Sequence, residues 1–119
     1  KEPRPEFGTP PATRRARSVN RLVLAARLVE RGALRYTPAG LPALDFELKH
    51  ESELSEDGQL RKVSMQIRSV GIGRITQPVS AMALGSAGSF VGFLATARNG
   101  RGLLFHVTAL EPASDLFSG

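Results

Sequence analysis

The 119-residue sequence contains no cysteine, no tryptophan and only two histidines. Without cysteine the chain forms no disulfide and offers no thiolate to a metal, and two isolated histidines do not form a zinc-binding pattern. Six phenylalanines and one tyrosine leave few rings for stacking on a ligand. The composition therefore excludes disulfide-stapled folds, argues against a zinc site and fits a reducing cytoplasm.

Long apolar runs are also missing from the sequence. No segment approaches the roughly 18 consecutive apolar residues that a membrane-spanning helix needs. The first residues are basic and rich in proline, with no apolar segment behind them, so we expect neither a signal peptide nor a membrane anchor. An apolar content of 41% in 119 residues is enough for one domain with one hydrophobic core.

The net charge of +5 is unevenly distributed along the chain. Residues 1–21 hold six basic residues against two acidic ones, a balance of +4, and the other 98 hold ten against nine, a balance of +1. Residues 1–18 are proline-rich and lack apolar periodicity, which predicts a disordered N-terminal tail or a remnant of cloning. Residues 112–119 are predicted to form a C-terminal tail. The folded domain is therefore expected at residues 19–111, where the position of each charge matters more than the sum.

Between these tails the apolar residues recur with a period of two, which is typical of β-strands. Turn signals separate the strands, among them Asp57-Gly58 within an acidic turn at 52–59 and Asn99-Gly100. Residues 71–85 contain Pro78 and are expected to form a loop with a short helical turn. The five predicted strands begin near residue 20 and then cover residues 43–50, 61–70, 89–97 and 103–110.

Five strands with the longest break between the third and the fourth predict an all-β fold, a five-stranded OB barrel whose closure limits exposed edges. An open five-stranded sheet and an SH3-like barrel have the same periodicity, and the pattern alone does not separate them. The first strand carries apolar residues on both faces, because Val23 and Val29 alternate with Leu22, Leu24 and Leu28. It is predicted to be buried on both sides or paired with a second subunit.

OB barrels bind single strands along their second and third strands, between the first loop and the loop that joins strands four and five. Most basic residues of the domain fall on these elements, including Arg31 in the first loop, and the acidic residues are expected to concentrate elsewhere, in the Glu51–Asp57 turn. This arrangement predicts a nucleic-acid groove that contacts mainly phosphates and is sensitive to salt. An ordinary solvated sheet surface is the alternative interpretation of the same charges. The candidate DNA-binding residues are Arg35, Tyr36, Lys49, Arg61, Lys62, Arg68, Arg98 and Arg101.

The sequence gives no support for catalysis. His50 and His106 have no evident nucleophile or metal partner, and Asp45 with Glu47 on one strand face defines no acid–base site. We therefore predict a protein that is not an enzyme and needs no cofactor. Phe105 lies near the second loop and is expected to be buried, as most phenylalanines are.

Three motifs occur in order between residue 20 and about residue 111. They are the segment NRLVL, a Pro-x-Gly-x-Pro loop followed by a strand that ends in LKHES, and the tripeptide GFL. Together they resemble primosomal replication protein N, a family of small bacterial replication-restart factors related to single-stranded DNA-binding proteins. Each motif is short, and it is their order and spacing that carry the resemblance.

This resemblance implies an OB-fold homodimer of the cytoplasm that binds single-stranded DNA non-specifically and stimulates the primosomal helicase without catalysis of its own. The implied partners are single-stranded DNA, the primosomal helicase, the single-stranded DNA-binding protein and a second copy of the chain, with no membrane. Tyr36, Lys49, Arg98 and Arg101 match positions that the family uses for DNA, whereas Val63 stands where some relatives have an aromatic residue. Two alternatives are a protein-interaction module of the primosome with minor DNA contacts and an RNA-binding protein of the cold-shock kind, which the lack of aromatic clusters disfavours.

Overall fold

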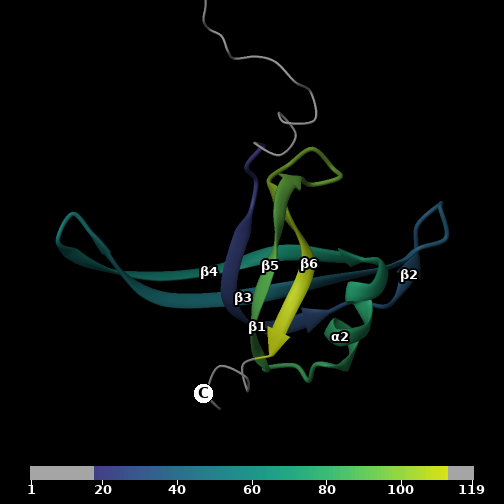
Figure 1. Cartoon of the computed structure of the whole chain (residues 1–119), viewed down its shortest axis with the longest axis horizontal. Helices are drawn as coiled ribbons and strands as arrows, with labels where there is room; N and C mark the ends of the chain where they lie inside the picture. The colour runs from purple at the N-terminus through teal and green to yellow at the C-terminus, as the bar shows by residue number, and fades with distance from the viewer. Residues whose placement is uncertain (1–17, 113–119) are drawn as a thin grey trace, which may run out of the picture.

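The structure is a computed structural model that describes residues 18–112, and the predictions for residues 1–17 and 113–119 lie outside this range. Strands form most of the described chain, and short helices lie between β4 and β5 (Figure 1). The strands are β1 (Leu22–Arg31), β2 (Arg35–Tyr36), β3 (Pro42–Glu56), β4 (Gln59–Ile72), β5 (Ala87–Thr96) and β6 (Leu103–Pro112); the helices are η2 (Gly73–Ile75) and α2 (Thr76–Ala81).

The sheet closes on itself. Its strand order is β1-β5-β6-β4-β3-β2, and an additional antiparallel pairing of β1 with β3 closes the ring of the five long strands. All pairings are antiparallel except that of β4 with β6, which run parallel through three residue pairs. Five long strands with this order form an OB barrel, so the predicted fold is confirmed and the open sheet is excluded. The predicted strands are all present, and β2 is an additional two-residue strand in the first loop.

The core lies inside the barrel and is made by the alternate residues of each strand. In β1 the buried residues are Leu24, Ala26 and Leu28, and the residues between them are exposed. Such alternation is expected where one sheet face meets a core and the other meets solvent. The rings of Phe46 and Phe90 pack at a centroid distance of 6.4 Å. With Leu48, Phe105 and Val107 these side chains fill the barrel.

The break between β4 and β5 contains the predicted short helical segment. Pro78 is the third residue of α2, where its missing amide hydrogen costs little because the first-turn amides lack intrahelical acceptors. Val79 is fully buried and Ile75 nearly so, and both join the barrel core. Residues 18–112 contain no helix with the length and apolarity that crossing a membrane requires.

The β3–β4 hairpin is longer than the sequence predicted. The expected acidic turn at 52–59 is wrong in extent, since β3 continues to Glu56, β4 starts at Gln59 and the two strands pair to the tip. The tip itself matches the prediction: Asp57 and Gly58 have φ angles of 51° and 80°, the left-handed conformation that tight two-residue hairpin turns require. The tip projects beyond the rest of the barrel (Figure 1).

The β5–β6 hairpin turns at residues 97–102, as the Asn99-Gly100 signal predicted. The amide of Gly100 donates to the Ala97 carbonyl at 2.8 Å, and the Ala97 amide donates to the Gly102 carbonyl at 3.0 Å. Further along, the register of β5 and β6 shifts beside Gly92. A Cβ placed on Gly92 would lie 1.8 Å from the carbonyl oxygen of His106. The close approach of the two backbones therefore requires glycine at this position.

Candidate nucleic-acid interface

The register of β3 and β4 places the charged residues of their barrel portion on the outer face of the barrel. Glu47 lies opposite Arg68 and Lys49 lies opposite Gln66, while the intervening pair Leu48 and Ile67 faces the core. Because side chains alternate along a strand, Asp45, Glu47 and Lys49 share this outer face. Lys49 also pairs with Arg27 of β1, which places a second cation beside it.

A groove of about 640 Å³ crosses the outer face between β2 and the loop at residues 97–102. Arg35 enters it from β2, Arg68 from β4 and Arg98 from the loop. Val70 of β4, His106 of β6 and Asn99 of the loop also line it. Three of the predicted DNA-binding residues, distant in sequence and carried by separate elements, are therefore brought to one groove.

Arg35 is held in the groove by Asp45. Its Nε donates to Oδ2 at 3.0 Å and its Nη2 donates to Oδ1 at 3.1 Å, a two-point pairing of guanidinium and carboxylate. The hydrogen bonds and the negative charge of Asp45 raise the pKa of Arg35 above its usual value. Both side chains are about half exposed, 40% and 56%, so this pair is open to solvent and to competing anions.

Two further predicted residues lie on the outer face beyond the groove. Lys49 is half-buried and is two positions along β3 from Glu47. Lys62 lies opposite Glu53 on the projecting part of the hairpin. The outer face thus carries Arg68, Lys49 and Lys62 in sequence from the groove toward the hairpin tip.

The remaining three predicted residues do not line the groove. Arg61 belongs to the opposite face of the hairpin, where its Nε contacts Glu56 Oε1 at 2.7 Å. Tyr36 is exposed and alternates with Arg35 along β2, so it points to the other side of that strand. Arg101 is exposed in the second loop, where its backbone amide donates to Asn99 Oδ1 at 2.9 Å.

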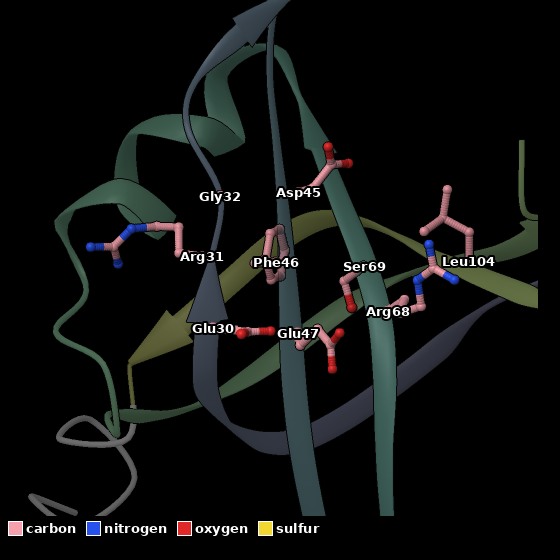
Figure 2. A pocket seen from close by; sticks show the side chains of 9 residues that line it. All are labelled: Glu30, Arg31, Gly32, Asp45, Phe46, Glu47, Arg68, Ser69 and Leu104. Carbon is pink, nitrogen blue, oxygen red and sulfur yellow. The ribbon is translucent and has the colours of Figure 1, made fainter.

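The predicted separation of acidic from basic residues is wrong. A second hollow of about 410 Å³ adjoins the groove and is lined by Glu30, Asp45 and Glu47 as well as Arg68. Figure 2 shows the carboxylates of Glu30 and Glu47 on neighbouring strands near Arg68. Register between strands, which a single sequence does not reveal, brings these carboxylates to the face that carries the arginines.

Arg31 was expected in the first loop among the groove residues. In the structure its side chain instead binds backbone carbonyl groups at the end of α2 and stabilises the fold. Its Nη1 donates to the carbonyl oxygen of Met82 at 2.6 Å and to that of Val79 at 3.4 Å. Figure 2 shows its side chain pointing away from Phe46 and toward α2. A cation at the end of a helix satisfies carbonyl groups that have no intrahelical donor.

The two histidines differ in their surroundings. His50 joins β3 to β1, with Nδ1 2.6 Å from the Ala25 carbonyl oxygen and Nε2 2.8 Å from Ser52 Oγ. His106 lies on the outer face and stacks on Phe93, with ring centroids 4.8 Å apart and ring planes at 7°. In the described part of the chain, no group of three acidic or histidine residues is placed to hold a metal ion.

Sequence reasoning missed the ring pair of Phe93 and His106. Phe93 is the central residue of the GFL motif and remains 39% exposed. The period-two alternation of β5 could have revealed this pair. Phe90 and Gly92 are buried and alternate with residues on the other face of the strand, where Phe93 lies. Phe105, by contrast, is fully buried as expected.

The barrel has counterparts among known proteins. Residues 20–109 match the family model described as another single-strand binding protein family. The single-stranded DNA-binding protein from Thermus aquaticus superposes with a TM-score of 0.62 over 79% of this chain and 50% of that one, at 24% identity, a likeness of fold alone. The class is therefore an OB barrel of the single-strand binding protein type.

Individual relatives narrow this class. The replication restart protein PriB of Bordetella pertussis is 46% identical over 80 residues, which cover 67% of this chain and 75% of that protein. PriB of Neisseria meningitidis serogroup B is 48% identical over 56 residues, 46% of this chain and 56% of that protein. The structure of PriB from Ralstonia solanacearum has a TM-score of 0.73 and 38% identity, covering 80% of this chain and 98% of that chain. The chain belongs to the family of the replication restart protein PriB.

Proposed function

We propose that this protein binds single-stranded DNA non-specifically along the outer face of β3, β4 and β6 and serves replication restart as an adaptor without catalytic activity. The observation that carries the proposal is the convergence of Arg35, Arg68 and Arg98 on one groove. Arginines from three elements around an open groove offer positive charge along a path, which is what a backbone of phosphates requires. Lys49 and Lys62 continue this path over the hairpin.

The proposed adaptor role also includes binding to the protein partners that family membership implies. We include stimulation of the primosomal helicase, association with the single-stranded DNA-binding protein and a cytoplasmic location in the proposal. A homodimer is supported by the apolar side chains on the outer face of β1, where Val23 is 50% and Val29 37% exposed. Light scattering that showed a monomer at micromolar concentration would contradict the dimer.

A second candidate function is a protein-interaction module whose DNA contacts are minor. It is favoured by exposed apolar side chains around the first loop, Leu34, Tyr36 and Leu41. It is also favoured by the carboxylates beside the groove, because they oppose the approach of phosphates. The two candidates differ in the affinity that each predicts for an oligonucleotide alone.

The test compares two arginines of the same strand, one on each face. Labelled oligothymidylate is titrated at several salt concentrations with the parent protein, with Arg68→Gln and with Arg61→Gln. We expect salt-sensitive binding by the parent, a loss of several-fold for Arg68→Gln with a salt slope lower by about 1, and a change of less than about twofold for Arg61→Gln. Absence of salt-dependent binding with helicase association intact would favour the interaction module instead.

A further inference from the structure

One row of residues crosses the outer face of four neighbouring strands. Asp45 of β3 pairs with Val70 of β4, Val70 pairs with His106 of β6, and His106 pairs with Phe93 of β5. His106 lines the groove, and Phe93 lies one strand further on. A bound nucleic-acid strand that follows this row out of the groove therefore reaches the Phe93 ring next.

The ring of Phe93 is held in one orientation by a neighbouring ring and is also accessible to solvent. Its near-parallel stack on His106, with centroids 4.8 Å apart, holds the ring against one neighbour, yet 39% of the residue is exposed. Burying a phenylalanine stabilises a fold, so an oriented ring left partly in solvent forgoes part of that gain. Phe90, three residues away on the core side, is fully buried in the same strand.

Cations lie at both ends of this row. Arg35 and Arg98 line the groove at one end. At the other end, the side-chain amide of Asn20 pairs with the backbone of Leu94 through two hydrogen bonds of 2.8 and 3.0 Å. The register of β1 and β5 ends at the pair of Leu22 with Gly92, so these bonds hold the chain just before β1 beside β5, and exposed Arg21 lies between Asn20 and Leu22. Cationic side chains are therefore available on both sides of the ring, Arg98 in the groove and Arg21 just before β1, where they could contact the phosphates next to a stacked base.

We propose that Phe93, supported from behind by His106, is a stacking platform for one nucleobase of a bound single strand. This proposal rests on the proposed function and assigns a specific base-contacting residue to it. Every base has a flat π-face, so a ring in this position contributes affinity without selecting a sequence. His106 acts as a positioning residue, because its ring holds that of Phe93 in one orientation on the outer face.

Two variants at this position test the proposal against two ligands, oligothymidylate and an abasic oligomer of equal length. Phe93→Leu keeps an apolar side chain and removes the ring. We expect its affinity for oligothymidylate to fall by at least about fivefold. Its affinity for the abasic oligomer, which offers phosphates without bases, should remain that of the parent. An equal loss on both ligands, or no loss on oligothymidylate, would overturn the proposal.

Phe93→Trp restores an aromatic ring and adds a reporter, because the natural chain has no tryptophan. We expect parental affinity and fluorescence that is quenched by oligothymidylate but not by the abasic oligomer. Leu54→Trp, on the exposed part of the hairpin, is the matched control and should show no quenching. Unquenched fluorescence at position 93, or a change of oligomeric state in Phe93→Leu by light scattering, would assign the ring to another role.

Failure of this proposal is distinguishable from failure of the proposed function. If Phe93 is not a platform, the parent protein still binds oligothymidylate with salt dependence and Arg68→Gln still weakens that binding. If the chain does not bind single strands, the parent fails with both ligands.

Discussion

The β3–β4 hairpin has two halves that share strands and pairing but differ in what covers them. The barrel half, residues 42–50 with 65–72, packs its inner face on the core, and Leu48 is fully buried there. The distal half, residues 51–56 with 59–64, continues the same register, yet Leu54 on the same face as Leu48 is 56% exposed. Backbone pairing alone extends a strand, and burial determines whether a residue on it stabilises the fold.

The first prediction compares one residue type in the two halves. Leu48→Ala should lower the free energy of unfolding by about 2–5 kcal/mol, because it leaves a cavity in a packed core. Leu54→Ala should change it by less than about 0.5 kcal/mol, since its side chain is already largely in solvent. Denaturant unfolding of both variants measures the difference. Comparable losses would mean that the distal half is covered in solution, for example by a second copy of the chain.

The second prediction compares two glycines, one in the barrel and one at the hairpin tip. Gly92→Ala should destabilise the fold by about 3 kcal/mol, because its Cβ would overlap the backbone of His106 and force β5 and β6 apart. Gly58→Ala has open space around its Cβ, and its cost of about 1 kcal/mol arises from the positive φ of 80°. Thermal unfolding ranks the two variants. A larger effect at the tip would show that the distal half contributes to stability.

The third and smallest effect concerns binding, and it separates the outer faces of the two halves. Asp45→Asn releases Arg35 from its two-point pairing and removes a negative charge from the groove. We expect oligothymidylate affinity to rise about two- to fivefold at low salt. Glu53→Gln removes the same charge from the distal half and should change affinity by less than twofold. Equal gains would mean that the distal half contributes as much to DNA binding as the groove does.

Much of this architecture was predictable from local pattern. Alternating apolar residues located the five strands, and Asp57-Gly58 and Asn99-Gly100 located two tight turns, because such signals act within a few residues. The strand ends beyond His50 and before Arg61 were not predicted. In that region the inner face has no core to bury, so the apolar alternation that marks a strand fades while backbone pairing continues.

The candidate site was predictable in its elements but not in its charge balance. The OB topology correctly brought the first loop, β4 and the second loop together, and with them Arg35, Arg68 and Arg98. The partner of each charged residue depends on cross-strand register, which is set over long distances in the sequence. For that reason the carboxylates beside Arg68, the use of Arg31 at α2 and the ring pair on Phe93 were visible only in the fold.

The parallel pairing of β4 with β6 is the shortest pairing between the long strands of the barrel. It consists of three residue pairs, from Ser69 to Gly71 of β4. Hairpins β3–β4 and β5–β6 form between neighbours in sequence, so this junction has to close across a large loop and is expected to be a late step of folding. The groove spans that junction, because Val70 and His106 on its two sides both line it. A polynucleotide bound in the groove would hold β4 and β6 together. Binding would therefore slow amide hydrogen exchange at the strand pairing that has the fewest residue pairs.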